Sequence, residues 1–287
     1  MRLENIRILV TGMTGTLGTR IALRLIPKAL EVRGLYRTKE QTAGNVPKRL
    51  LPIIGELNDQ ASLVAAMKDV DLLIHCAAYL GGPVRAEEAN VTGISNLAKA
   101  ATHAGVKRII HLSTTSVYGE TDGHFTEESP TSDTDQVYIK TKILSEQILL
   151  KETPHTDVII LRPGAICAEV NSHWGDHQVR RMKMADYVTW VHPKDIVPWV
   201  HADNLVEMII LTLSKGRDGD IFNAIDLNVP ETSFRMRLIE ASGRPYHIPN
   251  RSIERPTYSN EKMYELGYRP IRSFEKTMEE LISSFRT

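Results

Sequence analysis

The chain has 287 residues, of which 42% are hydrophobic and 24% charged, and this length allows one large domain or two smaller ones with a sizeable core. Lysine plus arginine and aspartate plus glutamate are equal at 35 each, so charge favours neither a nucleic acid nor a membrane surface as partner. No apolar run approaches the roughly 18 residues of a membrane span. An apolar run close to Met1 predicts that there is no signal peptide.

The two cysteines, Cys76 and Cys167, suggest a reducing compartment, and we expect a cytoplasmic protein. Either can serve as a small buried apolar side chain, since no nearby cysteine completes a CxxC pair. The 10 histidines show no HExxH or other metal-ligand spacing, so we expect no metal.

The first half of the chain alternates apolar runs with segments of helical spacing. The apolar runs predict strands over 6–10, 31–36, 50–54, 71–75, 107–112 and 157–162, and the helical spacing predicts helices over 16–26, 59–68, 84–104 and 136–152. This repetition predicts a mostly parallel sheet with helices on both faces. Right-handed crossovers then favour an α/β fold with a Rossmann-type doubly wound sheet.

From about residue 168 the pattern loosens. A helix is predicted over 203–214, a strand over 219–224 and an amphipathic helix over about 274–286. These later segments indicate a smaller C-terminal lobe.

A glycine-rich stretch, TGMTGTLG at 11–18, joins the first predicted strand to the first helix. Glycine allows a tight turn and lets the backbone approach a bulky ligand. The amides at the start of the helix carry partial positive charge, which suits a pyrophosphate. A turn without a ligand is the alternative, and the spacing differs from the usual GxGxxG, so this motif needs support from elsewhere in the chain.

Tyr138 and Lys142 stand four residues apart in YIKTK, on one face of the helix predicted over 136–152. An ammonium beside a phenol stabilises the phenolate and lowers the phenol's pKa from about 10. Such a tyrosine can donate and accept a proton near neutral pH. A chance pair on a surface helix is the alternative.

Hydroxyl side chains follow the strand predicted over 107–112: Ser113, Thr114, Thr115 and Ser116. Ligands of parallel α/β sheets bind beyond the carboxyl ends of the strands. We therefore expect one of these hydroxyls to hydrogen-bond a carbonyl oxygen while Tyr138 donates the proton. A polar turn at the strand end is the alternative.

Together these stretches resemble the extended short-chain dehydrogenase/reductase family, the NAD-dependent epimerase/dehydratase-like group, over nearly the whole chain. The matching segments are TGMTGTLG (11–18), GELND (55–59), HCAA (75–78), NVTG (90–93), HLSTTSVYG (111–119), FTEESP (125–130), YIKTK (138–142) and LRPGAI (161–166). Several motifs in the family's order are far more specific than any one of them. The resemblance predicts an NAD(P)-dependent oxidoreductase that transfers a hydride between nicotinamide and a carbonyl or alcohol.

The resemblance implies a role for each matching residue. It implies Tyr138 as the acid/base, Lys142 as the residue that lowers its pKa and holds the nicotinamide ribose, and Thr114 as the hydroxyl that polarises the substrate, with Ser113 and Thr115 as alternatives. The implied cofactor-binding residues are Gly12, Thr14, Gly15, Thr16, Leu17, Gly18, Tyr36, Arg37, Glu56, Leu57, Cys76, Ala77, Ala78, Asn90, Ser113, Tyr138, Lys142, Pro163, Gly164, Ala165 and Ile166.

The same resemblance divides the chain. We expect a dinucleotide-binding Rossmann domain over 1–167 and a mainly substrate-binding lobe over 168–287, with segments at about 195–225 returning to the Rossmann core.

The cofactor is predicted from the end of the second strand, in RGLYRTKE. An acidic residue there would accept hydrogen bonds from the ribose hydroxyls and repel a 2′-phosphate. Tyr36 stands at that position and Arg37 follows it, so no acid is present. Arg37, together with Lys39, can bind a 2′-phosphate. We therefore favour NADP(H), with NAD(H) and a solvent-exposed basic loop as alternatives.

The segment VPWVHADN at 197–204 matches the stretch where nucleotide-sugar members of the family carry an Arg-Asp pair that grips the substrate diphosphate. Val197 and Pro198 stand in place of that pair, and Asn204 in place of the last acid. The segment is more similar to the 3β-hydroxysteroid dehydrogenase and carbonyl-reductase branch. We therefore expect a largely apolar carbonyl compound or alcohol, while Arg180 and Arg181 leave a sugar nucleotide open.

The apolar surface for such a substrate is expected from Trp174, Trp190, Trp199, Met182 and Met184, with core packing as the alternative. Two other classes of function stay open. One is a nucleotide-sugar epimerase or dehydratase that uses NAD(P) transiently. The other is a non-catalytic NADP-binding regulatory protein, which the intact Tyr138 and Lys142 pair disfavours. We expect a small-molecule substrate, no nucleic acid and no membrane as partners, and a homodimer stays open.

Overall fold

The computed structural model describes residues 2–43, 46–79, 81–119 and 121–286. The chain divides into two compact units. The first unit comprises Met1–Gly119, Thr131–Arg162 and Ile209–Phe222, and the second comprises Glu120–Pro130, Pro163–Met208 and Asn223–Thr287.

A parallel sheet of seven strands forms the centre of the first unit, in the order β10-β7-β5-β4-β1-β2-β3. The strands are β1 (Arg7–Thr11), β2 (Glu31–Tyr36), β3 (Leu50–Ile54), β4 (Leu72–His75), β5 (Arg108–Leu112), β7 (Asp157–Pro163) and β10 (Ile221–Ala224). The predicted doubly wound α/β fold is confirmed. All seven strands had been predicted, each with its start within two residues and its end within one residue of these bounds.

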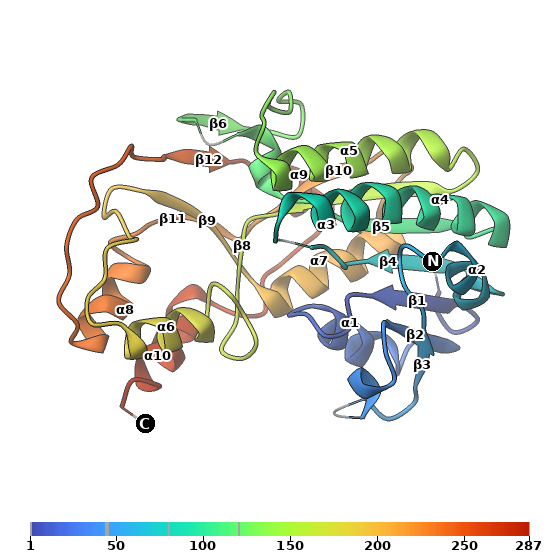
Figure 1. Cartoon of the computed structure of the whole chain (residues 1–287), viewed down its shortest axis with the longest axis horizontal. Helices are drawn as coiled ribbons and strands as arrows, with labels where there is room; N and C mark the ends of the chain where they lie inside the picture. The colour runs from blue at the N-terminus through green and yellow to red at the C-terminus, as the bar shows by residue number, and fades with distance from the viewer. Residues whose placement is uncertain (1, 44–45, 80, 120, 287) are drawn as a thin grey trace. The chain divides into compact units, whose positions relative to one another are not determined.

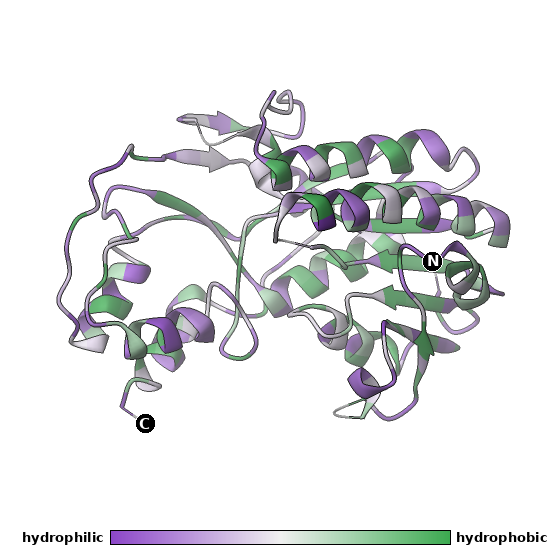
Figure 2. Ribbon diagram, viewed as in Figure 1, coloured by the Kyte–Doolittle hydropathy of each residue, from purple (hydrophilic) through white to green (hydrophobic). Residues whose placement is uncertain are grey.

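The central strands are near-continuous apolar runs because both faces of the sheet are covered. On one face, Leu9, Leu73 and Ile109 belong to a core that α2 (Gln60–Met67), α4 (Gly93–Ala104) and α5 (Val137–Glu152) complete. Helix α1 (Gly18–Leu25) lies on the other face (Figure 1). Figure 2 shows these strands mostly hydrophobic, whereas α4 and α5 alternate hydrophobic and hydrophilic positions as half-buried helices do.

The predicted helix over 84–104 is wrong in one respect, because it consists of three pieces. Helix α3 (Pro83–Glu87) leads into a π-helical turn, Glu88–Thr92, and then into α4. A π-helical turn inserts one extra residue into the helical ladder, which sequence periodicity does not reveal. Gly105, with φ of 68°, ends α4.

Among the described residues of the second unit there are two small sheets and four helices of its own. The larger sheet joins β8 (Ala165–Cys167), β9 (Ile196–His201) and β11 (Leu227–Pro230), and the smaller joins β6 (Gly123–Phe125) and β12 (Pro256–Tyr258). The helices are α6 (Asp176–Met184), α8 (Arg235–Ser242), α9 (Glu261–Glu265) and α10 (Phe274–Ser283), and α7 (Ala202–Lys215) begins here. The core of this unit is mostly aliphatic and includes the aromatic rings of Trp199, Phe234 and Phe274. The ring of Trp199 meets that of Phe274 edge-on, with centroids 5.1 Å apart.

Among the residues that the structure describes, none of the helices combines the length and the apolar character that crossing a bilayer requires.

Candidate active site

The glycine-rich stretch forms a close turn between β1 and α1, for reasons that the backbone makes clear. Gly12 has φ of 74°, and a Cβ there would lie 2.8 Å from the amide nitrogen of Ala77. A Cβ on Gly18 would lie 2.5 Å from the carbonyl oxygen of Gly12. Both positions therefore require glycine: the first for its conformation and its approach to the end of β4, the second for close packing of the helix on the loop.

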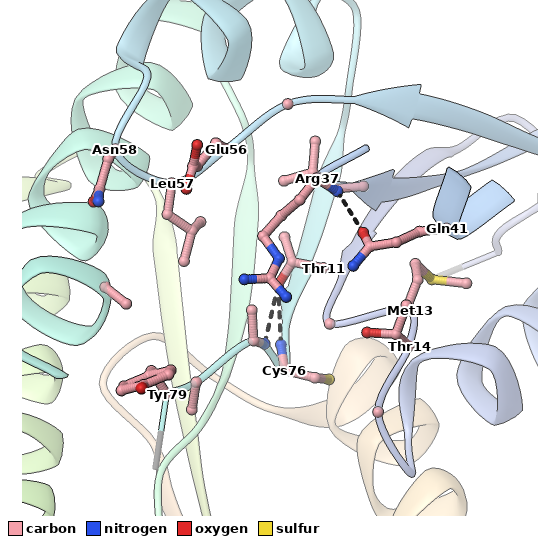
Figure 3. A pocket seen from close by; sticks show the side chains of 17 residues that line it. Thr11, Met13, Thr14, Arg37, Gln41, Glu56, Leu57, Asn58, Cys76 and Tyr79 are labelled. Carbon is pink, nitrogen blue, oxygen red and sulfur yellow. Dashed lines mark hydrogen bonds between the residues drawn. The ribbon is translucent and has the colours of Figure 1, made fainter. Parts of the chain in front are cut away.

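A cavity of about 270 Å³ opens at the carboxyl ends of β1, β2, β3 and β4 in the first unit (Figure 3). Nine of the residues implied as cofactor ligands line it: Gly12, Thr14, Gly15, Arg37, Glu56, Leu57, Cys76, Ala77 and Ala78. Sequence reasoning did not assign a role to four polar lining residues: Thr11, Gln41, Asn58 and Tyr79. Thr11 and Asn58 lie within the TGMTGTLG and GELND segments but were not singled out, whereas Gln41 and Tyr79 lie outside the matching segments and enter only through the folded backbone.

Arg37 extends from the end of β2 into this cavity (Figure 3). Its backbone amide donates a hydrogen bond to Oε1 of Gln41 at 2.9 Å. The Tyr36 side chain is buried and does not line the cavity, and burial raises its pKa. Lys39 does not line it either. Of Tyr36, Arg37 and Lys39, Arg37 is therefore the residue that can bind an anion in the cavity.

Several other implied cofactor ligands do not line this cavity. They are Thr16, Leu17, Gly18, Tyr36, Asn90, Ser113, Tyr138 and Lys142 in the first unit. Pro163, Gly164, Ala165 and Ile166 belong to the second unit, where a Cβ on Gly164 would collide with Pro198 of β9.

The side-chain amide of Asn90 is hydrogen-bonded within the protein through both its oxygen and its nitrogen. Oδ1 accepts a hydrogen bond from the amide of Tyr79, and Nδ2 donates to the carbonyl oxygen of Tyr79, both at 2.9 Å. Nδ2 also donates to Oγ1 of Thr141 at 3.3 Å, and that hydroxyl donates to the carbonyl oxygen of Tyr138 at 2.9 Å. Asn90 thus connects the wall of the cavity to the turn of α5 that carries Tyr138.

The Thr114 hydroxyl lies near the phenol of Tyr138 and favours the ionised form of that phenol. Thr114 is the second residue after the end of β5, and Tyr138 lies in the first turn of α5. Burial raises the pKa of Tyr138, and the Thr114 hydroxyl opposes that rise only in part. The phenol is therefore protonated at neutral pH and can act as a proton donor.

The two alternative hydroxyls lie differently. Ser113 is buried, and its Oγ has no hydrogen-bond partner among the described residues. Thr115 is buried at the start of a 3-10 turn, Thr115–Tyr118. Of the three, Thr114 is the one whose side chain meets Tyr138.

Lys142 lies one turn after Tyr138 on α5 and is 3% exposed. Its Nζ donates a hydrogen bond to the carbonyl oxygen of Leu112 at 2.5 Å. Burial lowers the pKa of Lys142 to about 8, against the opposite influence of Glu146 and Cys76. Burial outweighs any effect of the ammonium on the phenol, whose pKa is raised, and Lys142 Nζ is turned toward Leu112. That Lys142 favours the Tyr138 phenolate stays a prediction.

Part of the expected apolar surface in the second unit is instead core. Met182 is fully buried and Trp199 is 1% exposed. Met184 points away from the core and is 87% exposed. Only Trp174 and Trp190 are half-buried, and each carries an arginine over its ring.

The cationic side chains of α6 have partners within the second unit. Arg180 forms an ion pair with Asp176, one turn earlier. The guanidinium of Arg181 lies 3.8 Å from the ring centroid of Trp190. Val197, which stands in place of the family's arginine, is 5% exposed and belongs to the core of the unit.

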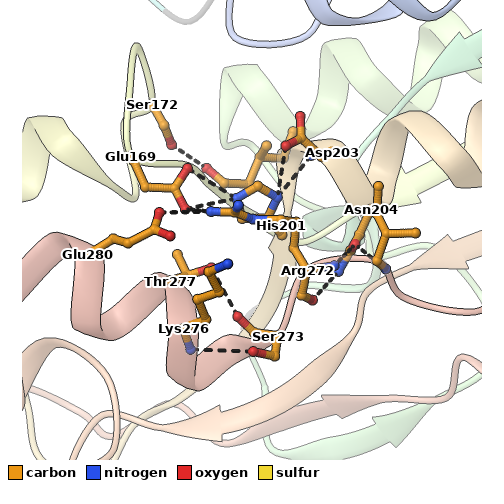
Figure 4. Close-up of polar contacts among 12 residues, drawn as sticks. Glu169, Ser172, His201, Asp203, Asn204, Arg272, Ser273, Lys276, Thr277 and Glu280 are labelled. Atoms are coloured by element: carbon orange, nitrogen blue, oxygen red, sulfur yellow. Dashed lines mark hydrogen bonds and ion pairs between the residues drawn. The ribbon is translucent and has the colours of Figure 1, made fainter.

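Asn204, the residue matched to the last acid of the family's segment, forms hydrogen bonds with residues 271–272, which precede α10 (Figure 4). Its Oδ1 accepts hydrogen bonds from the amides of Ile271 (2.9 Å) and Arg272 (2.8 Å). Arg272 Nη2 in turn donates to Glu169 at 2.5 Å and to Glu280 at 2.8 Å. This network accounts for the Asn204 side chain without a ligand.

His201 completes the same network from the end of β9 (Figure 4). Its Nδ1 accepts a hydrogen bond from the amide of Asp203 at 3.0 Å, so Nε2 carries the proton and faces the carboxylate of Glu169 at 3.3 Å. Burial would raise the pKa of Glu169, but the hydrogen bonds from His201 and Arg272 outweigh it and lower the pKa. Among the described residues there is no group of three or more metal-binding side chains.

Comparison with known proteins agrees with this fold. Residues 8–224 match the model of the NAD dependent epimerase/dehydratase family. The chain therefore belongs to that family and is an NAD(P)-dependent enzyme of the extended short-chain dehydrogenase/reductase type.

Individual relatives differ in their chemistry. The chain is 25% identical over 257 residues to a 4-hydroxy-2-methyl-3-oxo-4-farnesyl-3,4-dihydroquinoline-1-oxide ketoreductase of Stigmatella aurantiaca, covering 85% of this chain and 75% of that protein. It is 28% identical over 175 residues to a 3-beta-hydroxysteroid dehydrogenase of Mycolicibacterium neoaurum, covering 56% of this chain and 47% of that protein. The chain thus spans three quarters of the first relative and about half of the second.

A solved structure is similar over the whole length. The dTDP-glucose 4,6-dehydratase of Streptomyces venezuelae, crystallised with NAD, is 26% identical, with a TM-score of 0.84, covering 98% of this chain and 97% of that one.

Proposed function

We propose that this chain transfers a hydride between a nicotinamide dinucleotide and a carbonyl or alcohol substrate, with Tyr138 as the acid/base. The observation that carries the proposal is that the side chains of Tyr138 and Thr114 lie together near the end of β5, with Lys142 buried one turn further along α5. A protonated phenol beside a second hydroxyl is the arrangement that a carbonyl oxygen needs while it gains a proton. The first unit then serves as the dinucleotide-binding domain and the second unit supplies the substrate-binding surface.

The cavity of the first unit fits a dinucleotide. Gly12 and Gly15 lie in the cavity wall, and the absence of a Cβ at Gly12 and Gly18 lets the loop turn closely against β4 and α1. The wall also presents the backbone of Cys76, Ala77 and Ala78. These features supply the close backbone approach that a pyrophosphate requires at the start of a helix.

The proposed reduction divides its work between the cofactor and the chain. The bound nicotinamide supplies a hydride to the carbonyl carbon. Tyr138 Oη gives its proton to the carbonyl oxygen as that oxygen takes the electron pair of the C=O bond, and the Thr114 hydroxyl donates a hydrogen bond to the same oxygen. Lys142, as an ammonium, stabilises the phenolate that remains. In the reverse direction Tyr138 takes the proton from the alcohol.

We favour NADP(H) as the cofactor. Arg37 is exposed and lines the cavity, whereas Tyr36, at the position where an acid would read the ribose, is turned into the protein. A guanidinium can bind a 2′-phosphate with two hydrogen bonds. Glu56 also lines the cavity and keeps NAD(H) as the alternative, as does the NAD of the dehydratase from Streptomyces venezuelae.

The proposed substrate is a largely apolar ketone or alcohol. Val197 stands where a diphosphate clamp would need an arginine, and it is buried in the core of the second unit. The ketoreductase of Stigmatella aurantiaca and the dehydrogenase of Mycolicibacterium neoaurum are named for a farnesylated quinoline and a steroid, both largely apolar. Cytoplasmic location and a homodimer stay predictions.

A sugar-nucleotide dehydratase or epimerase is the second candidate, supported by the likeness to the dTDP-glucose 4,6-dehydratase. The two functions differ in their use of the cofactor. Purified protein is mixed with NADPH and a panel of ketones, and the loss of NADPH absorbance is followed. Net oxidation of NADPH in step with alcohol formation supports the reductase. Turnover of a dTDP- or UDP-sugar without net change in the cofactor supports the second candidate, and tight NADPH binding without either reaction supports a regulatory protein.

A further inference from the structure

A buried ion pair between Glu146 and Arg162 lies beside the proposed catalytic lysine. Both side chains are at most 5% exposed. Arg162 donates from Nε to Oε1 of Glu146 at 3.0 Å and from Nη2 to Oε2 at 2.6 Å. Its third nitrogen, Nη1, donates to Oη of Tyr118 at 2.9 Å. Removing both charges from water offsets much of the free energy that their attraction supplies at this depth. Stability alone therefore does not account for the pair.

Glu146 is placed to act on Lys142. Tyr138, Lys142 and Glu146 are spaced by four residues on α5 and therefore share one face of the helix. The carboxylate of Glu146 is the largest influence that favours the charged form of Lys142 against burial. Arg162 holds that carboxylate from β7 through two of its nitrogens.

The other titratable groups that face Lys142 do not supply a counter-charge. Cys76 follows β4, and burial raises the pKa of its thiol to about 12. His75 on β4 and His111 on β5 are buried, and both pKa values are lowered far enough to keep the imidazoles neutral at physiological pH. Tyr138 is a protonated phenol.

We propose that the Glu146–Arg162 pair is a positioning device for Lys142. The carboxylate of Glu146 keeps the lysine an ammonium, and the guanidinium of Arg162 holds that carboxylate in place and partly offsets its negative charge. The inference rests on the proposed function for its catalytic meaning, since it is the ammonium that stabilises the Tyr138 phenolate. The geometry itself exists without substrate or cofactor.

The two partners have opposite effects on Lys142. Glu146→Gln removes the negative charge, so the pKa of Lys142 falls by about one unit or more. Arg162→Gln leaves the carboxylate without its cationic partner, so the pKa of Lys142 rises. A loss of packing would instead admit water in both variants and move both values the same way, toward that of free lysine. Opposite signs therefore separate an electrostatic role from a bracing role.

The measurement is a pH titration of the protein alone, by nuclear magnetic resonance of carbon-13 labelled lysine. The Lys142 signal is assigned by its absence in Lys142→Arg. The double variant Glu146→Gln/Arg162→Gln leaves no buried unpaired charge, so it folds where a single variant fails, and it should still titrate lower than the wild type. Glu146→Asp keeps the charge and should titrate close to the wild type.

The matched control is the ion pair between Arg108 and Asp157, 2.6 Å apart at the amino-terminal ends of β5 and β7. Arg108→Gln/Asp157→Asn removes a pair between the same two strands and should leave the Lys142 titration unchanged. In active protein, the alkaline limb of the kcat/KM profile should follow the Lys142 titration in each variant.

A wild-type titration in the folded double variant, or shifts of the same sign in both single variants, would overturn the inference. The titration needs no activity. A chain in which Tyr138→Phe proves harmless would refute the proposed function and leave this test intact.

Discussion

The hydroxyl oxygen of Thr11 lies 2.8 Å from Nδ1 of His75 and also accepts hydrogen bonds from the amides of Cys76 and Ala77, each at 3.2 Å. Because both amides donate to it, the hydroxyl must give its own proton to His75. His75 is therefore a neutral imidazole with its proton on Nε2. Thr11 fixes the strand end that forms one wall of the cavity, and His75 fixes Thr11.

Replacement of Thr11 by valine tests this relationship. Valine keeps the shape but leaves two amides and one imidazole nitrogen without their partner, which costs about 1–3 kcal/mol for each buried group. NADPH affinity should fall by about tenfold, equivalent to 1.4 kcal/mol, as the cavity wall loosens. Thr156→Val is the control, since its hydroxyl donates to Val106 away from the cavity. It should lower the free energy of unfolding without changing the affinity, and equal affinities for both variants would refute the role of Thr11.

The stacked pair of His75 and His111 predicts a loss of stability in acid. The rings are 5.5 Å apart, both are buried, and burial lowers the pKa of His75 to about 3 and that of His111 well below its usual value. Between about pH 6.5 and pH 3 the unfolded chain binds protons that the folded chain does not. The free energy of unfolding should therefore fall as the pH falls through this window, by up to about 1.4 kcal/mol per pH unit for each histidine.

Urea unfolding at a series of pH values measures this slope. His111→Phe should reduce it, because one of the two groups no longer takes up a proton on unfolding. His155→Phe is the control, since this exposed histidine lies outside the pair and should leave the slope unchanged. An unchanged slope in His111→Phe would show that the histidine pair does not set the acid limit.

Arg37→Ala should weaken NADPH binding by about tenfold or more and NADH binding far less. A charge-assisted hydrogen bond to a phosphate contributes roughly 1.5–3 kcal/mol, and NADH has no phosphate there. Fluorescence titration with each cofactor makes the comparison. Lys39→Ala is the matched control, because Lys39 does not line the cavity. Equal losses for both cofactors would mean that Arg37 does not read the 2′-phosphate.

UDP and dTDP should bind poorly to the protein saturated with NADPH. The second unit has Val197 in its core at the position of the family's diphosphate clamp, Arg180 is paired with Asp176, and Arg181 lies over Trp190. Burying a neutral polar group without a hydrogen bond costs roughly 2–7 kcal/mol, and burying a diphosphate without charge-assisted partners costs more. Isothermal titration decides the matter. Micromolar binding of either nucleotide would move the dehydratase or epimerase to first place.

The sequence allowed the sheet to be predicted because its strands are buried on both faces and read as apolar runs. It also indicated the glycines that the loop requires: Gly12 for its left-handed backbone conformation and Gly18 because a Cβ there would collide with the loop. Residues whose place depends on side-chain packing were harder. Gln41 and Asn58 enter the cavity from turns, the π-helical turn at Glu88–Thr92 interrupts a regular pattern, and Trp199 is core although its neighbours suggested a binding surface. The sequence also did not predict that Lys142 Nζ donates to the carbonyl oxygen of Leu112. Periodicity predicts which face of a helix a residue lies on but not its hydrogen-bond partner.

The most direct test of the account is single-turnover hydride transfer by Tyr138→Phe with a ketone that the wild type reduces. Phenylalanine fits the half-buried position but has no proton to give, so the rate should fall by about a hundredfold to ten-thousandfold, the usual contribution of a general acid. NADPH affinity should stay within a few-fold, because the cavity of the first unit is untouched. Tyr246→Phe, which loses a phenol hydrogen bond to Val191, should keep the wild-type rate. A Tyr138→Phe variant that reduces the ketone at nearly the wild-type rate would contradict the assignment of Tyr138 as the acid/base.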